Sequence, residues 1–356
     1  MRELTYCNRR AVQIENASVR VTMTAEGANI AEITCKRTSI NPLWTPPWPS
    51  LEPTAANESQ LADYGANQES RVLASIVGHS LCLDTYGAPS PEETAAGMPI
   101  HGEALAVAYE IHGDGLTMNA KGDLPLARLR FERSVRLAGD SKVAVLQFRE
   151  AVENLTAFDR PIAWTQHVTL GPPFIDCGRT QFRIAARRSK VIDADFGGSQ
   201  MSGAEFEWPF CPAKDGSTID LRVFPNHSPS GGFTTHLVNR DLEHGHFVAW
   251  SPSSGIAFGY AWRRDDFPWL CRWEENHLRS APPWNGRTMV CGMEFGVSPF
   301  VESRREMVTR GSLFGVPTYL WLPAKSRVEV RYCAFIGGAE SAPESVVWDE
   351  RGFVRY

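Results

Sequence analysis

The segment VAVLQFREAVEN (residues 143–154) is followed closely by a second apolar segment, RPIAWTQHVTLGPPF (residues 160–174). In the first segment, the odd positions from Val143 and the even positions from Ala144 would point to opposite faces of an extended chain. The second segment ends in Gly-Pro-Pro, which stops a strand because proline has no backbone N–H to donate. Both segments are therefore predicted β-strands, and an ionisable residue, His167, lies near the end of the second one.

Strand pairs joined by turns recur along the chain. They cover residues 17–37 with a turn at Glu26-Gly27, residues 105–122 with a turn around Gly113-Asp114-Gly115, and residues 129–154 with a turn at Gly139-Asp140. A last strand is predicted within residues 326–336. Because these hairpins do not alternate with helices, we predict an all-β fold, a large antiparallel sandwich or barrel.

The remaining segments give the organisation of the chain. Helical character is found only in residues 298–311. Residues 44–70 and 85–99 are rich in proline, glycine and small polar residues, so we predict long loops, which often carry binding residues. No fixed repeat and no linker divides the sequence, and large all-β folds reach this length undivided. We therefore expect one domain over residues 1–356.

The composition indicates which kinds of partner and which cellular compartment to expect. The chain has 36 basic and 41 acidic residues, so it lacks the positive footprint that nucleic-acid binding requires. No apolar run approaches the roughly 20 residues of a membrane span, and the first residues lack the apolar core of a secretory signal. The eight cysteines are scattered without a C-x-x-C pair, which indicates reduced core residues. We expect a cytoplasmic protein that binds neither nucleic acid nor membrane, and the sequence does not indicate its oligomeric state.

The familiar nucleotide and hydrolase motifs are missing. There is no Walker motif and no G-x-G-x-x-G after a strand. The segment GGSQMSG is not a G-x-S-x-G elbow, since Met201 occupies the second glycine position. What remains is a set of ionisable groups in unusual settings: His101 in GMPIHGEA, His167 in WTQHVTLGPP and Glu294 in VCGMEFGVSPF.

These three residues do not carry equal weight. A histidine at a strand end is commonly a half-exposed polar residue with an ordinary hydrogen bond, so neither His101 nor His167 alone indicates a site. Glu294 is more informative, because a carboxylate inside an apolar strand is costly to desolvate unless it is paired or functional. We predict that Glu294 lines a cavity, where burial would raise its pKa toward the range useful for proton transfer.

A metal site is the competing interpretation. His244 and His246 would place two imidazoles on one face of a strand. The following residues, FVAWSPSSG, offer no carboxylate to complete a ligand set. We therefore predict no metal, and a catalytic metal at this pair stays open as the alternative.

The order and setting of these residues resemble the aldose 1-epimerase (galactose mutarotase-like) superfamily over most of the chain. The resemblance rests on ENASVRVTMTAEGANIAEITCK (15–36), RSVRLAGDSKVAVLQFREAVENLTAFDRPIAWTQHVTLGPPF (133–174) and SLFGVPTYLWLPAKSRVEVRYCAFI (312–336). It implies a large antiparallel β-supersandwich that binds a small carbohydrate and uses no cofactor. It also implies that His167 is the general acid for the ring oxygen, that Glu294 is the base for the anomeric hydroxyl, and that His101 positions the sugar.

Further sugar contacts are expected from aromatic and charged residues. Aromatic faces suit the C–H faces of sugars, so Trp164, Trp273 and Trp284 are candidates, although large aromatics equally fill a sandwich core. Arg71 is a candidate ligand of sugar hydroxyls, on a loose positional resemblance.

The sequence also departs from the family pattern. The segment FPNHSPSGGFTTHLVNRDLEHGH (224–246) has no equivalent of the family's sugar-binding aspartate, and Asn226, His227 and His236 are its candidate replacements. In GHSLCLDTYGAP (78–89), His79 and Asp84 stand where galactose mutarotases carry an arginine motif, and both are candidate sugar-binding residues. We therefore expect a sugar or sugar derivative other than plain galactose.

Two functions from different classes follow. The first is a cofactor-independent epimerase, which the acid and base residues favour. The second is a carbohydrate-binding protein without turnover, which the missing aspartate favours.

Overall fold

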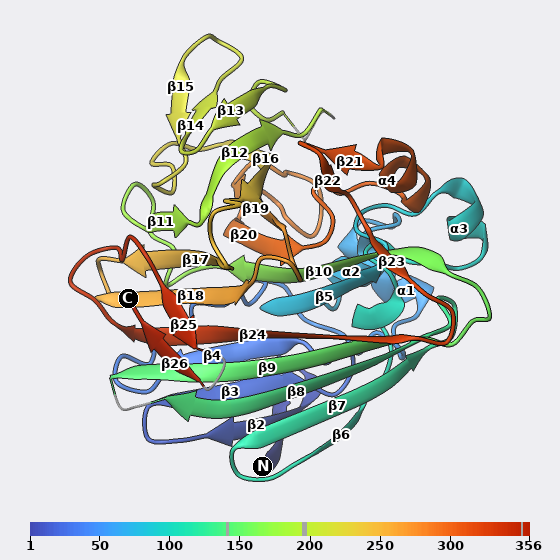
Figure 1. The fold of residues 1–356 in the computed structure, drawn as a ribbon. Coiled ribbons are helices and arrows are strands. Elements are labelled where there is room, and N and C mark those ends of the chain that lie inside the picture. Colours follow the sequence, from blue (N-terminus) through green and yellow to red (C-terminus); the bar gives the residue numbers. More distant parts are fainter. Residues whose placement is uncertain (140–141, 194–197, 350–351) are drawn as a thin grey trace.

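The computed structural model describes residues 1–139, 142–193, 198–349 and 352–356. Two large antiparallel sheets dominate these residues (Figure 1). The larger sheet runs in the order β1 (Arg2–Tyr6), β2 (Arg9–Glu15), β3 (Val19–Thr24), β4 (Ile30–Cys35), β5 (His79–Asp84), β10 (Arg160–Leu170), β20 (Met289–Gly296), β19 (Trp269–Asn276), β16 (Ser230–Val238), β12 (Ala186–Val191) and β13 (Glu205–Glu207), and β23 (Leu320–Leu322) also pairs with β10.

The second sheet packs against part of the first. Its order is β11 (Gln181–Ile184), β17 (His244–Ser251), β18 (Ile256–Arg263), β24 (Arg327–Gly338), β9 (Val143–Asn154), β8 (Leu129–Gly139), β7 (Thr117–Leu124) and β6 (Glu110–Gly113). Figure 1 shows β2 to β4 lying behind β7 to β9. Residues of both sheets, such as Val21 and Ile33 from one and Phe131 and Val135 from the other, form one apolar core. The fold is thus a large antiparallel β-sandwich, which confirms the predicted class.

Short elements complete the chain. Three small hairpins are formed by β14 (Phe210–Pro212) and β15 (Thr218–Asp220), β21 (Ser312–Leu313) and β22 (Val316–Pro317), and β25 (Val347–Asp349) and β26 (Phe353–Arg355). The helices are α1 (Glu58–Leu61), α2 (Ser70–Leu73), α3 (Pro91–Ala95), α4 (Arg304–Arg310) and the 3₁₀ turns η1 (Ala62–Tyr64) and η2 (Glu103–Leu105). No helix in the described part of the chain has the length and apolar character needed to cross a membrane.

Most local predictions hold. The hairpins β3–β4 and β6–β7 turn where the sequence indicates, and β8–β9 form the third pair, although Asp140 of its predicted turn lies outside the described residues. The predicted helix of residues 298–311 is shorter, because Ser303 caps α4 and exchanges capping-box hydrogen bonds with Glu306. The two predicted loops contain the short helices α1 and α3.

The outer face of the larger sheet is the one that matters for the site. A second apolar cluster covers it, combining strand residues such as Cys82, Ala163 and Cys271 with residues from the segments between the strands, such as Trp44 and Leu73. The segment between β4 and β5, including α2, therefore packs on this face. This segment covers the central strands β10, β20 and β19.

Candidate active site

His167 and Glu294 face each other at the centre of the larger sheet. Strands β10 and β20 are antiparallel neighbours, and their register places the two residues directly opposite each other. The His167 Nε2 atom lies 3.4 Å from Glu294 Oε1, and the residues are 5% and 1% exposed. Residues opposite each other in an antiparallel pair share a face. Two sequence-distant ionisable groups thus form one buried acid–base pair.

Tyr86 holds the other oxygen of Glu294. Its hydroxyl donates a short hydrogen bond to Glu294 Oε2, and burial raises the pKa of Tyr86, so the phenol keeps its proton. Burial also raises the pKa of Glu294, while His167 and the Tyr86 hydroxyl oppose that rise. Glu294 is therefore a carboxylate whose affinity for a proton is higher than usual and whose position is fixed.

Gly292 gives the Glu294 side chain its space. It precedes Glu294 by two residues on β20 and therefore lies on the same face. A Cβ atom at Gly292 would overlap Glu294 Oε1 and would lie 3.2 Å from the Cβ atom of Trp273. The absence of a side chain here is a local requirement of the site.

His101 approaches the pair from the segment after α3. Its backbone has a positive φ of 65°, and its ring centroid lies 5.5 Å from that of His167 and 5.9 Å from that of Tyr86. Burial, with His167 and Arg279 nearby, lowers the pKa of His101 to about 3, so the ring is neutral. Its Nδ1 atom accepts the N–H of Gly87 at 3.2 Å. The ring proton must then be on Nε2, which is a hydrogen-bond donor.

His101, His167 and Glu294 line one cavity of about 250 Å³. Its polar side chains are Glu69, His101, His167, Arg279 and Glu294. Trp273 and Trp284 also line it, and the guanidinium of Arg279 lies over both indole rings, 5.7 and 4.8 Å from their centroids. The Nε1 atom of Trp273 is buried without a hydrogen-bond partner.

The arrangement is suited to proton transfer on a small polar ligand. Glu294 can take a proton, His167 can give one, and a single ligand can reach both because they are adjacent. Among the described residues, no three His, Cys, Asp or Glu side chains are grouped so that they could hold a metal ion. Of the alternative pair, His244 stacks edge-on against Trp348, and burial lowers the pKa of His246 to about 4.

Two of the sequence candidates point to the wrong face of the sheet. Trp164 lies three positions before His167 on β10, so it points to the opposite face, the sandwich core, where it packs against Phe267. His236 pairs with Leu270, which also faces that core, and its ring nitrogens contact Ser189 and Thr234 at 2.7 and 2.9 Å. Neither residue lines the cavity.

His79 is a third correction. Its two ring nitrogens lie 3.0 Å from the Tyr260 hydroxyl and 2.9 Å from Gln166 Oε1. It is fully buried between the sheets, and burial lowers its pKa well below the usual range. With both nitrogens occupied by core residues, His79 has no free atom for a ligand.

Asp84 has a structural role instead of a binding one. Its carboxylate is buried and forms ion pairs with Arg160 at 2.5 Å and Arg304 at 2.5 Å. Arg304 also pairs with Glu93 at 2.8 Å. Asp84 thereby joins β5, β10, α3 and α4 around the segment that carries Tyr86 and His101.

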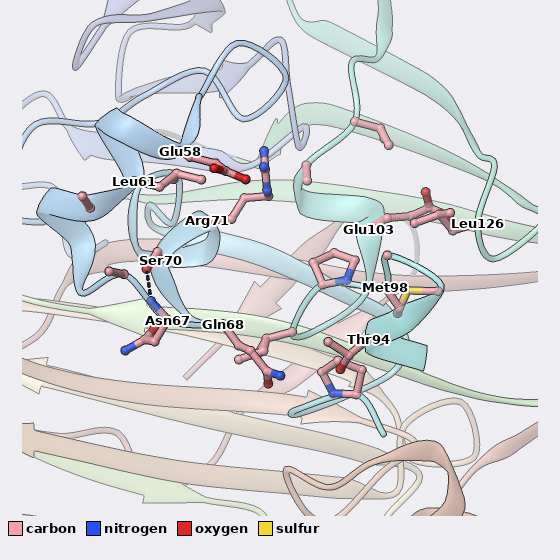
Figure 2. A pocket seen from close by; sticks show the side chains of 18 residues that line it. Glu58, Leu61, Asn67, Gln68, Ser70, Arg71, Thr94, Met98, Glu103 and Leu126 are labelled. Carbon is pink, nitrogen blue, oxygen red and sulfur yellow. Dashed lines mark hydrogen bonds between the residues drawn. The ribbon is translucent and has the colours of Figure 1, made fainter. Parts of the chain in front are cut away.

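Arg71 lies outside the cavity in a neighbouring cleft. This cleft has a volume of about 600 Å³ and is also lined by Glu58, Glu103 and Met98 (Figure 2). The Nη1 atom of Arg71 donates to the carbonyl of Pro53 at 3.0 Å. Asn226 and His227 line yet another cleft, beside β15. The predicted contacts of these three residues with the sugar are therefore not supported.

Tyr86, Gly292 and Arg279 are the site residues that the sequence did not reveal. Gly292 could have been found, because it stands two residues from a buried glutamate within a strand. Tyr86 and Arg279 lie in irregular segments, and no sequence period predicts where such side chains point.

Comparisons with known proteins agree with this architecture. No protein-family model matches the sequence, and no curated protein matches it. A solved structure of a candidate aldose 1-epimerase from Klebsiella pneumoniae is similar with a TM-score of 0.67 and 12% identity, over 94% of this chain and 80% of that one. A galactose mutarotase-like protein from Clostridium acetobutylicum is similar with a TM-score of 0.64 and 12% identity, over 95% and 98% of the chains.

A galactose mutarotase-related enzyme from Lactobacillus acidophilus is similar with a TM-score of 0.59 and 12% identity, over 94% of this chain and 99% of that one. At such low identity, the likeness concerns the fold. This chain therefore has the fold of the aldose 1-epimerase and galactose mutarotase-like proteins.

Proposed function

We propose that the cavity binds one aldose and that His167 and Glu294 interconvert its α and β anomers. The observation that carries this proposal is the pairing of an acid and a base directly opposite each other in a cavity of about 250 Å³. That volume is at the small end for ligand sites, which suits a single sugar ring. The fold shared with aldose 1-epimerase-like proteins supports the same reading.

The chemistry needs two proton transfers at neighbouring oxygens. The Glu294 carboxylate removes the proton of the anomeric hydroxyl, O1, while the His167 imidazolium gives a proton to the ring oxygen, O5. The C1–O5 bond breaks with its electron pair going to O5, and C1–O1 becomes the carbonyl of the open aldehyde. Rotation about C1–C2 followed by the reverse transfers closes the ring as the other anomer. Both enzyme groups end as they began, so no cofactor is consumed.

Neighbouring groups would hold this pair and the sugar. The Thr169 hydroxyl lies 3.1 Å from His167 Nδ1 and can accept the second imidazolium proton. The His101 Nε2–H is a donor for a sugar hydroxyl. The indole faces of Trp273 and Trp284 suit the C–H face of the ring.

A sugar-binding protein without turnover is the second candidate. The observation that favours it is the separation of 3.4 Å between His167 and Glu294, because a closed ion pair can satisfy itself without a substrate. Such a protein would bind the same sugars without changing their anomers.

One experiment distinguishes the two functions. Exchange of anomeric protons is measured by NMR for a panel of neutral aldoses, deoxy sugars, uronic acids and sugar phosphates, and binding of the same sugars is measured by calorimetry. The proposal expects at least one sugar whose anomers exchange faster with protein than in buffer. A sugar that binds but exchanges at the buffer rate would establish the binding function instead.

A further inference from the structure

The cavity offers few polar partners for a sugar beyond the acid–base pair. One donor is the Nε2–H of His101. The remaining polar side chains are Glu69 and Arg279, which lie 3.7 Å apart as an ion pair. Arg279 also lies 3.8 Å from Glu275, so two carboxylates offset its charge. The cavity therefore has no surplus positive charge for an acidic sugar.

The rest of the lining is apolar. Six aliphatic and aromatic side chains line the same cavity: Val72, Leu73, Ile76, Ile100, Phe233 and Val301. Val72, Leu73 and Ile76 come from α2 and the residues just after it, so they form one continuous apolar wall over the sheet. A hexose hydroxyl placed against this wall would meet only apolar side chains.

The side chains of Val72, Leu73 and Ile76 carry no donor or acceptor for such a hydroxyl. Moving a hydroxyl out of water without a compensating hydrogen bond is unfavourable, whereas a methyl or methylene group gains from the same burial. The wall therefore selects against hydroxyls at one edge of the ring while the acid–base pair requires O1 and O5 at another.

We propose that the ligand of this cavity is a neutral deoxy aldose, one in which a hydroxyl is replaced by hydrogen at the edge that meets Val72, Leu73 and Ile76. This inference rests on the proposed sugar site and specifies its substrate class. A pocket of this kind favours the deoxy member of a matched pair by about ten- to one-hundredfold.

The test uses matched pairs of sugars with the full chain. Dissociation constants and anomer exchange are compared for L-fucose and L-galactose, D-fucose and D-galactose, L-rhamnose and L-mannose, and 2-deoxy-D-glucose and D-glucose, with glucuronic acid and N-acetylglucosamine as further probes. We expect one deoxy sugar to bind at least tenfold more tightly than its hydroxylated partner. Equal or tighter binding of the hydroxylated member in every pair, or a preference for the acidic or acetylated probe, would overturn the inference.

A variant of the wall gives an independent readout. Val72→Thr replaces a methyl group by a hydroxyl of similar shape and supplies a partner for a sugar hydroxyl. The ratio of the dissociation constants of the hydroxylated sugar and its deoxy partner should shrink severalfold. Thermal unfolding checks that the variant is folded. An unchanged ratio in a folded variant would show that the wall does not make the selection.

The two proposals fail in different ways. If hydroxylated aldoses bind and exchange their anomers equally to deoxy aldoses, the proposed function stands and the inference about the substrate class fails. If no sugar of the panel binds, both fail.

Discussion

At the scale of single residues, Tyr86 lowers the proton affinity of the proposed base. Its hydroxyl donates to Glu294 Oε2, and a hydrogen bond to the charged form of a carboxyl group lowers its pKa. Burial acts in the opposite direction and is the largest influence, so the net pKa of Glu294 is raised. Because the proposed base must be ionised, the rate of anomer exchange should increase with pH as Glu294 loses its proton.

Tyr86→Phe should therefore move this pH profile. Removing the hydroxyl takes away a group that lowers the pKa of Glu294, so the midpoint of the rising limb should move to higher pH. Exchange at a fixed pH on that limb should slow down. The matched control is Tyr109→Phe, which removes a buried hydroxyl that donates to the carbonyl of Ala104 at 2.9 Å outside the cavity. Identical profiles for the two variants would mean that Tyr86 does not tune Glu294.

At the scale of elements, the register between β10 and β20 creates the site, and Gly292 keeps it open. Gly292→Ala would place a methyl group on Glu294 Oε1, so the carboxylate must move. We expect exchange to fall at least tenfold, with a loss of about 1–3 kcal/mol in unfolding free energy from overpacking. Gly115→Ala is the control, because a Cβ atom there meets nothing within 4 Å. A Gly292→Ala variant with full activity would contradict the placement of Glu294.

The ion pairs of Asp84 hold the elements around the cavity together. Asp84→Asn leaves Arg160 and Arg304, 12% and 23% exposed, without their buried carboxylate. We expect a loss of stability on the order of 3 kcal/mol, measured by urea unfolding. The control, Asp123→Asn, breaks an exposed pair with Arg130 and should cost less than about 1 kcal/mol. Equal costs for both variants would show that Asp84 does not organise this region.

Sequence reasoning was effective for elements and weaker for side-chain direction. Hairpins such as β3–β4 are local, so alternation and turn residues are enough to find them. Trp164 is a candidate sugar contact from its place near His167 in the sequence, but the two-residue period of β10 places it on the opposite face. The position of His236 depends on a register with β19 that is set by long-range pairing, which no local pattern predicts.

At the scale of the whole molecule, one face of the larger sheet forms the stabilising core and the other face carries the proposed site. The inner face packs against the second sheet, and the outer face carries His167 and Glu294 under loops. The fold was predictable because hairpins define the class. The position of the segment between β4 and β5 was not predictable. Contacts with Trp44 and Trp48 place α2 and the residues after it, and their own sequence pattern does not.

Buried neutral histidines should make the molecule sensitive to acid. Burial lowers the pKa of His236 to about 3 and of His246 to about 4, so the unfolded chain binds more protons than the folded one between those values and about 6.5. Their contribution to stability is present above about pH 6.5 and is lost on acidification. NMR titration should find no protonation of either ring between pH 8 and 5. A midpoint near 6.5 for both would contradict their burial.

The most direct test of the central claim is the rate of anomer exchange at saturating sugar for the wild type and Glu294→Gln. Glutamine keeps the shape of the side chain and can still accept the Tyr86 hydrogen bond, but it cannot take a proton. We expect exchange to fall about 10²–10⁴-fold while the sugar still binds. Equilibrium unfolding checks that the variant is folded. A Glu294→Gln variant that exchanges anomers at the wild-type rate would contradict the account.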